Sequence, residues 1–365
     1  MKIREVIQLL EEFAPLELQE SYDNAGLNLG NPEADLTGIL CTVDVTEEVV
    51  EEAERLKANL IVSHHPVIFS GIKSITGSNS HERIIIRAIQ NNIALYSAHT
   101  NLDNVKDGVN YQIAEKLNLK KLRVLEPMRK NLVKLVTFVP ENHALKVRDA
   151  LFQGGAGNIG EYDSCSYNLR GQGTFRGREG TNPFVGEQGK IHFEDEVRIE
   201  TIVPDYLLGK VLKKLFETHP YEEVAYDLYP LLNENPLAGN GVLGELPEEA
   251  TPESFLEILK TTFHIPAIRY AGNTSKKIKY VAVCGGAGSF LISRALHSNA
   301  DAFVTGDLKY HQFFEAENKI LLCDIGHYES EQFTKELLFT LLSKKLSKFA
   351  VHLSEVVTNP IKYHV

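Results

Sequence analysis

Short apolar segments alternate with helical patterns in the first and last thirds of the chain, and this alternation constrains the fold more than any other sequence feature. In the first third, apolar segments over 38–43, 60–63 and 93–97 are separated by helical patterns over 46–57 and 81–91. Strands this short and apolar are typical of parallel sheets that are covered by helices on both faces. The sequence therefore predicts an α/β fold.

The last third repeats this order of strands and helices. Strands are predicted over 280–284, 301–305 and 319–324, and helices over 288–298 and 328–345. The similarity of the two thirds indicates a diverged duplication. We therefore expect two similar α/β halves that form one core with mostly parallel sheets.

The middle of the chain has a different pattern. The predicted elements between 128 and 233 follow the order β-α-β-β-α-β, and the stretch from Gly154 to Gly189 is rich in glycine. This order is that of a ferredoxin-like α+β domain. At 365 residues the chain is also longer than one compact core usually requires. We expect a core of residues 1–127 plus 234–365 that is interrupted by a domain inserted at 128–233.

Charge and cysteine content narrow the function and the compartment. Lys and Arg number 38 against 49 Asp and Glu, and the net charge of −11 disfavours a primary nucleic-acid binder. The four cysteines are scattered without a Cys-x-x-Cys pair, which argues against a disulfide framework. The N-terminal pattern is an amphipathic helix rather than a signal peptide, and no apolar stretch reaches the roughly 20 residues of a membrane span. We therefore expect a cytoplasmic protein that does not contact membranes.

Two adjacent histidines, His64 and His65, directly follow the strand predicted over 60–63. Within a strand, neighbouring side chains point to opposite faces. At the carboxyl end of a parallel strand the chain turns, so both rings can face the crevice where open α/β sheets bind ligands. Taken alone, a His-His pair is more often structural than functional.

Further candidate ligands follow two other predicted strands. Asp103 lies just beyond the strand over 93–97, and His327 and Glu331 follow the last strand. His327 and Glu331 are four residues apart, so they share one face if a helix begins there. Each has a simpler explanation, since Asp103 could cap a helix over 105–117 and the His-Glu pair could be solvated. The coincidence of three strand ends favours a metal site.

The candidate ligands combine imidazole nitrogens with carboxylate oxygens, which suits Zn²⁺, Fe²⁺ or Mn²⁺ rather than Ca²⁺ alone. The predicted metal ligands are His64, His65, Asp103, His327 and Glu331. Two of the five are carboxylates able to bridge, which predicts two divalent ions roughly 3.5–4 Å apart that activate a shared water. The sequence therefore predicts a metal-dependent hydrolase with a dinuclear centre.

Three further residues are candidates for lining the pocket or shuttling protons. They are His99, Asp307 and His311. His99 could equally bond to the backbone, Asp307 could cap the next helix, and His311 could lie on the helix surface. The glycine-rich turn at 285–288 could cradle a phosphate, but it lacks the lysine of a P-loop, so a tight turn is favoured.

Five motifs occur in the order in which a known family has them. They are Tyr22 to Leu27, Ser63 to Pro66, His99 to Asp103, Thr305 to Asp307 and Gly326 to Glu331. In these motifs the chain resembles the dinuclear metal-centre proteins called GTP cyclohydrolase 1 type 2 homologs, the NIF-three-like family. The resemblance covers 1–127 and 234–365.

The resemblance implies further properties. The family's two metals are bound by residues that match the five predicted ligands, and members with a long middle insert carry a domain like the PII and CutA signalling proteins. Members form a ring-shaped homohexamer, and the family name implies hydrolytic opening of the guanine imidazole ring of GTP. The family's aromatic residue before Asp23 is often Trp, whereas this chain has Tyr22.

A second class of function stays open at this point. The chain could be a non-catalytic metal-binding adaptor or regulator, whose inserted domain senses a small ligand, because a fold does not determine a function. Open coordination positions at the metals would favour an enzyme, and fully enclosed metals would favour a structural role. Nucleic-acid binding through a ring would need a basic lining, which the net charge of −11 does not suggest.

Overall fold

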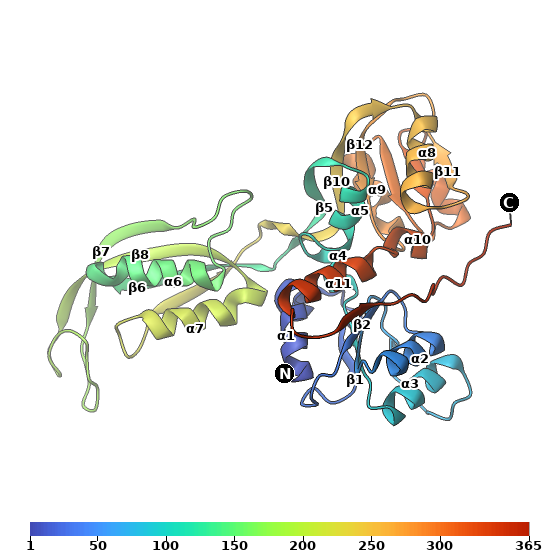
Figure 1. Ribbon diagram of the computed structural model, residues 1–365. Helices are drawn as coiled ribbons and strands as arrows, with labels where there is room; N and C mark the ends of the chain where they lie inside the picture. Colours follow the sequence, from blue (N-terminus) through green and yellow to red (C-terminus); the bar gives the residue numbers. More distant parts are fainter. Residues whose placement is uncertain (365) are drawn as a thin grey trace. The chain divides into compact units, whose positions relative to one another are not determined.

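The computed structural model describes residues 1–364 and divides the chain into two compact units (Figure 1). The first unit comprises Met1–Glu126 together with the chain from Ala238 onward, and the second comprises Pro127–Leu237. The first unit contains two sheets and the second contains one.

One sheet of the first unit has five strands in the order β1-β4-β3-β2-β15. Strands β2 (Ile39–Thr42), β3 (Leu60–Ser63) and β4 (Ala94–Ser97) pair in parallel and are buried throughout. At the edges, β1 (Gly26–Leu29) is antiparallel to β4 and β15 (Val351–Leu353) is parallel to β2. The parallel centre was predicted, whereas the two edge strands were not, because they are only partly buried and lack a continuous apolar run.

Helices cover both faces of this sheet, as the apolar strands require. They are α1 (Ile3–Phe13), α2 (Glu47–Leu56), α3 (Ser80–Gln90) and α11 (Thr334–Lys345). Residues of α2 and α3 share a core cluster with Leu40 and Ile61, whereas residues of α1 and α11 share one with Cys41 and Val62. Since neighbours along a strand point to opposite faces, the two helix pairs lie on opposite sides of the sheet.

The other sheet of the first unit has six strands in the order β11-β14-β13-β12-β10-β5. Its parallel centre consists of β12 (Ile278–Val283), β13 (Ala302–Thr305) and β14 (Leu321–Asp324). The outer strands are β11 (Arg269–Gly272), which is antiparallel to β14, β10 (Glu234–Ala250), which is antiparallel to β12, and β5 (Lys120–Arg129). A mixed α/β core with largely parallel sheet centres was predicted and is confirmed.

Two helices of the second half are shorter than predicted. The helix expected over 288–298 starts as a 3₁₀ turn at Ser289–Leu291 and continues as α9 (Ile292–His297). The helix expected over 328–345 is divided into the short α10 (His327–Glu331) and α11. The remaining helix of this half, α8 (Pro252–Phe263), follows β10.

The region after β4 also differs from the prediction of a helix over 105–117. Asp103 lies inside the short α4 (Thr100–Asn104), and α5 (Val109–Lys116) begins only after Gly108. A Cβ atom on Gly108 would lie 1.9 Å from the carbonyl oxygen of Leu102, so the tight turn between the helices requires glycine. Asp103 therefore does not cap α5.

The second unit has the predicted β-α-β-β-α-β order. Its elements are β6 (Leu132–Pro140), α6 (Ala144–Gly154), β7 (Tyr167–Phe175), β8 (His192–Pro204), α7 (Leu208–Thr218) and β9 (Tyr226–Pro230). The sheet is antiparallel in the order β7-β8-β6-β9. Residues of α6 and α7 share a core cluster with Leu135 and Ile199, so both helices cover the same face. Strand β7 lies within the glycine-rich stretch from Gly154 to Gly189.

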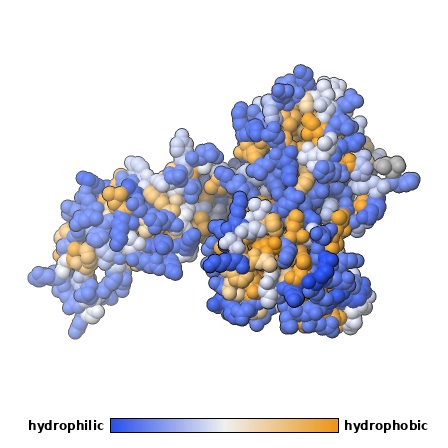
Figure 2. All heavy atoms as spheres, viewed as in Figure 1, coloured by the Kyte–Doolittle hydropathy of each residue, from blue (hydrophilic) through white to orange (hydrophobic). Residues whose placement is uncertain are grey.

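The polarity of the surface and the state of the cysteines agree with what the composition predicts. The face shown in Figure 2 is mostly hydrophilic, with hydrophobic residues in separate patches. All four cysteines are free, and three of them are buried. Among residues 1–364, we find no helix with both the length and the apolar character needed to cross a bilayer.

A buried carboxylate on α2 holds the chain just after β15. Glu52 is 4% exposed and accepts hydrogen bonds from the Ser354 hydroxyl (2.5 Å) and the Glu355 N–H (3.0 Å). Glu52→Ala leaves both donors without an acceptor, which costs about 1–3 kcal/mol. We therefore expect this variant to lower the free energy of unfolding by that amount and to speed amide hydrogen exchange in β15.

The neighbouring Glu51→Ala provides the control, because the one side-chain contact of Glu51 within residues 1–364 is an exposed ion pair with Arg87. Such pairs contribute at most about 1 kcal/mol and often nothing measurable, so the free energy of unfolding should change little. Denaturant titration and hydrogen exchange by mass spectrometry measure both effects. Unchanged protection of β15 in Glu52→Ala would contradict the anchoring role.

Candidate metal centre

His64 and His65 lie at the carboxyl end of β3, where the chain turns and the N–H groups of both residues bond to the carbonyl of Val43 (3.0 Å each). The Nδ1 of His64 donates to the Ala98 carbonyl (2.8 Å), which can only accept, so Nε2 presents its lone pair. The Nδ1 of His65 lies 2.7 Å from Oδ1 of Asp44. Both rings are therefore oriented through Nδ1, as is usual for metal-binding histidines.

Helix α10 supplies a third imidazole and a carboxylate. His327 and Glu331 are four residues apart, so they share one face of the helix. The Nδ1 of His327 lies 2.8 Å from Oδ2 of Asp307, and its Nε2 lies 3.2 Å from Oε2 of Glu331. His327 thus repeats the arrangement of His65, with a carboxylate on Nδ1 and Nε2 directed into the cluster.

The carboxylate of Glu331 contacts imidazoles from two different directions. Its Oε1 lies 3.5 Å from Nε2 of His64, and its Oε2 lies 3.1 Å from Nε2 of His65. Oδ1 of Asp103 lies 3.7 Å from Nε2 of His64. The donors therefore fall into two sets: Nε2 of His64 lies within 4 Å of both Asp103 and Oε1 of Glu331, whereas His65 and His327 face Oε2.

The spacing of the donor atoms fits shared cations. Ligand atoms of His64, His65 and Glu331 all lie within 4.8 Å of one another. The Nε2 atoms of His65 and His327 are 3.2 Å apart. Two nitrogen ligands at about 2.0–2.1 Å from one tetrahedral ion would be about 3.3 Å apart. These two imidazoles are therefore spaced like ligands of one ion.

Three buried atoms of the cluster lack a hydrogen bond of acceptable geometry with any of residues 1–364. They are Nε2 of His64, Oδ1 of Asp103 and Oε2 of Glu331. His64 is fully buried and Glu331 is 3% exposed. Buried polar atoms are nearly always satisfied by a partner, and an unpaired buried carboxylate is costly. The donor set therefore fits a bound cation.

The electrostatics of the cluster favour positive charge. Burial acts to raise the pKa of Glu331, but the charge that His64 can carry and the other imidazoles close to its oxygens hold that pKa well below its ordinary value. Burial raises the pKa of Asp103, and the charge of Glu331 adds to this effect while His64 opposes it. Burial acts to lower the pKa of His65, but the hydrogen bond to Asp44 and the nearby carboxylate of Glu331 raise it to about 10. Protons and metal ions would therefore compete for these donors.

The glycine-rich turn after β12 forms part of the wall around Glu331. The N–H of Gly286 donates to the Ser330 hydroxyl, and that of Gly288 donates to the Thr305 hydroxyl (2.9 Å each). These donors are occupied within the protein, so the favoured tight turn, and not the phosphate cradle, fits the structure. Gly286 has φ +58°, and a Cβ atom there would lie 2.4 Å from Oε1 of Glu331. The close approach therefore requires glycine.

His99 lies beside the cluster. Its ring centroid is 5.4 Å from those of both His64 and His65, and its Nδ1 lies 2.7 Å from Oδ1 of Asp23. Asp23 also accepts the N–H of Thr100 (3.0 Å). Burial acts to raise the pKa of Asp23, but the hydrogen bonds from His99 and Thr100 lower it to about 2. Asp23 is therefore an anion that orients His99.

The other two predicted pocket residues lie farther out. Asp307 contacts His327 at Nδ1, which is the side away from the cluster, so it orients that ring. His311 is exposed, and its ring packs against Tyr310 and Phe314. Among the contacts of residues 1–364, none joins His311 to the five predicted ligands.

Asp44, which holds His65, was not predicted from the sequence. Asp44 lies two residues beyond the end of β2, as His65 lies two residues beyond the end of β3, so its position after a buried strand was a usable signal. Burial acts to raise its pKa, but the hydrogen bond from His65 lowers it. The second oxygen of Asp44 accepts the Thr358 hydroxyl (2.6 Å). The role of Thr358 could not be predicted from the sequence, because Thr358 and Asp44 lie far apart in the chain.

Known proteins resemble this chain over nearly its whole length. The family model of Duf34/NIF3 (NGG1p interacting factor 3) matches residues 1–360. Two proteins named GTP cyclohydrolase 1 type 2 homolog are similar in sequence. The one from Halalkalibacterium halodurans is 42% identical over 363 residues, with 98% of each chain covered. The one from Staphylococcus epidermidis is 37% identical over 368 residues, with 100% of each chain covered. A Bacillus cereus protein related to NIF3 has a similar crystal structure, with a TM-score of 0.88 and 39% identity over 100% of this chain and 99% of the other. These matches confirm the resemblance read from the motifs, and the chain belongs to the Duf34/NIF3 (NGG1p interacting factor 3) family.

Proposed function

We propose that the chain is a metal-dependent hydrolase with a dinuclear centre, which opens the imidazole ring of a guanine nucleotide such as GTP. The observation that carries this proposal is the convergence of three imidazoles and two carboxylates, with three buried donor atoms that lack a partner among residues 1–364. The name shared by the relatives supports the substrate class.

The two sets of donors around Glu331 support two ions rather than one. His64 and Asp103 would hold one divalent ion with Oε1 of Glu331, and His65 and His327 would hold the other with Oε2. Glu331 would then bridge the pair. Nitrogen and carboxylate donors together suit zinc, iron or manganese.

When bound, such ions supply a Lewis acid and an activated water. The chain's own residues orient the donors, because Asp44 and Asp307 hold the imidazoles of His65 and His327. The Nδ1 of His99 is held by Asp23, which leaves Nε2 to move a proton to or from the substrate. A general acid is needed because the departing ring nitrogen must be protonated when the C–N bond breaks.

We also propose a domain arrangement, an oligomeric state and a cellular location for the protein. The β-α-β-β-α-β order and antiparallel sheet of the second unit support a PII/CutA-like domain over 128–233, inserted in a metal-binding core of 1–127 plus 234–365. The four free cysteines suit the reducing cytoplasm. The ring-shaped homohexamer rests on the family resemblance.

A second candidate function is that of a non-catalytic adaptor or regulator whose inserted domain senses a small ligand. The observation that favours it is a large pocket in the second unit, lined by residues that belong to that unit alone. In this case the metal centre would serve structure or metal storage.

Metal content tests the ligand assignment. The purified protein should contain about two divalent ions per chain by mass spectrometry of the elements. His64→Ala and Glu331→Ala should each lose at least one, because every ligand removed from a site weakens binding. His81→Ala is the matched control, since His81 is exposed on α3. Full occupancy in both ligand variants would show that the assignment is wrong.

Removing the carboxylate behind His65 tests the orienting role of Asp44. We expect Asp44→Asn to weaken metal binding by about 10–100-fold while the fold is retained, because the ring loses its anionic partner. Competition with a chelator of known affinity measures the change. Asp227→Asn, which alters an exposed carboxylate of the second unit, controls for the loss of charge and should bind metal like the wild type.

Turnover of GTP tests the activity itself. Metal-loaded protein should convert GTP to a ring-opened product, which chromatography and the loss of guanine absorbance detect. Glu331→Ala should lower kcat/KM by more than about 100-fold, and His81→Ala should not change it. If metal-loaded protein leaves all guanine nucleotides intact, the adaptor function replaces the hydrolase.

A further inference from the structure

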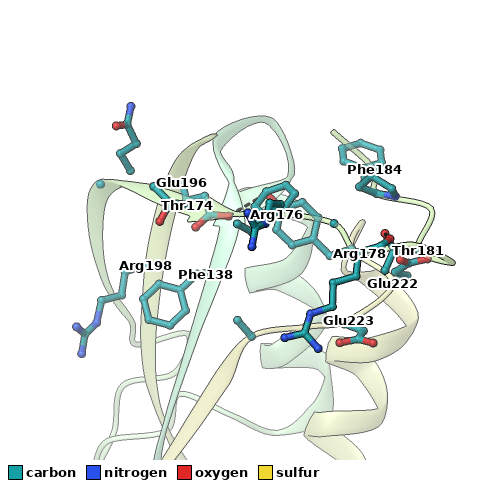
Figure 3. Close-up of a pocket in the computed structure, with 18 of the residues that line it drawn as sticks. Phe138, Thr174, Arg176, Arg178, Thr181, Phe184, Glu196, Arg198, Glu222 and Glu223 are labelled. Carbon is teal, nitrogen blue, oxygen red and sulfur yellow. Dashed lines mark hydrogen bonds between the residues drawn. The ribbon is translucent and has the colours of Figure 1, made fainter. Parts of the chain in front are cut away.

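The second unit contains a pocket of about 780 Å³ that the metal centre does not use (Figure 3). Phe138 of β6 and Arg198 of β8 line it, and both alternate with the buried residues that α6 and α7 cover. The pocket therefore lies on the opposite face of the sheet. Its volume is within the range of about 300–1,000 Å³ that is typical of small-molecule sites.

Aromatic rings form much of the wall. The ring of Tyr221 lies 5.8 Å from that of Phe175 and 6.3 Å from that of Phe184. Phe184 is 51% exposed, so this cluster faces the pocket instead of filling a core. Exposed aromatic faces at such distances offer a surface on which a planar ring can stack.

Two arginines of the pocket lack an ion pair with any of residues 1–364, namely Arg176 and Arg178 (Figure 3). The other two arginines of the lining are paired, because Arg170 lies 2.6 Å from Glu141 and Arg198 lies 2.9 Å from Glu200. The guanidinium groups of Arg176 and Arg178 therefore keep their full capacity to bind an anion.

Three carboxylates also line the pocket, but among residues 1–364 none of them forms an ion pair with Arg176 or Arg178. Glu196 accepts the Tyr221 hydroxyl (2.8 Å), and Glu222 accepts the N–H of Asn182 (3.0 Å). Burial and the charge of Glu196 raise the pKa of Tyr221, so the phenol keeps its proton and remains a donor. Glu223 has no such hydrogen bond with any of residues 1–364, and it lies on the segment toward which Arg178 extends (Figure 3).

We propose that this pocket binds a small anion that carries a planar ring, with the ring against Phe175, Phe184 and Tyr221 and the anionic group on Arg176 and Arg178. Neither feature alone accounts for the lining. An inorganic anion would leave the aromatic wall exposed, and a neutral ring would leave two arginines uncompensated. The site lies wholly in the second unit, so it does not depend on the proposed hydrolase.

The full-length protein and the fluorescent probe 1-anilinonaphthalene-8-sulfonate test this proposal. The probe joins planar rings to one sulfonate, whereas N-phenyl-1-naphthylamine has the same rings without the charge. We expect the sulfonate to bind at least about tenfold more tightly than the neutral compound, since a charge-assisted hydrogen bond contributes about that factor. R176Q/R178Q should remove this difference, and R176K/R178K should keep part of it.

Two controls separate this site from other surfaces. K213Q/K214Q removes two positive charges from α7, which does not line the pocket, and should bind the sulfonate like the wild type. Glu331→Ala should also bind it unchanged, so failure at the metal centre is distinguishable from failure here. Equal affinity of R176Q/R178Q and wild type for the sulfonate would overturn the proposal.

Competition identifies the anionic group of the ligand. Adenosine monophosphate and 4-aminobenzoate each carry a ring and an anion, whereas inorganic phosphate has no ring. Displacement of the probe by the first points to a heteroaromatic phosphate, and displacement by the second points to an aromatic carboxylate. If neither competes better than inorganic phosphate, the proposed ring-bearing ligand is wrong.

Discussion

The arrangement of the core depends on the contacts between the buried carboxylate of Glu331 and the imidazoles of His64 and His65. The carboxylate is nearly inaccessible to solvent, and its two oxygens lie 3.1–3.5 Å from imidazoles that belong to the other half of the core. A buried carboxylate is tolerated only when positive charge or hydrogen bonds compensate it. The two halves must therefore meet with His64 and His65 facing α10, and the glycine turn at Gly286 leaves the space in which they do so.

The histidines of the cluster share one design. In His64, His65 and His327, an oxygen on Nδ1 holds the ring so that Nε2 faces the interior. His64 has a neutral partner, the carbonyl of Ala98. His65 and His327 have anionic partners, the carboxylates of Asp44 and Asp307. An anionic partner makes an imidazole a stronger electron donor. The donors on the Oε2 side of Glu331 should therefore hold a cation more strongly than His64 does.

The sequence predicted the parts of the fold that repeat a simple pattern. Buried parallel strands such as β2 and β3 are continuous apolar runs in the sequence. The polar residues that end these runs can therefore be recognised from the sequence. The edge strand β15 and the contact of Thr358 with Asp44 could not be predicted, because both join distant segments without a local pattern. The lengths of α4 and α10 also escaped prediction, since α4 ends at the turn that Gly108 makes against Leu102 and only a two-residue turn separates α10 from α11.

The position of β15 has a consequence for how the protein is made. This strand belongs to the sheet of the first half, yet the ribosome synthesises it only after the second unit and the second half of the core. Until then, the edge of β2 has no neighbour, and Asp44 lacks the hydroxyl that supports it. Contacts this distant in sequence form slowly, and an unpaired strand edge is prone to aggregate. The first half therefore exposes an unpaired strand edge for most of the time in which the chain is being synthesised.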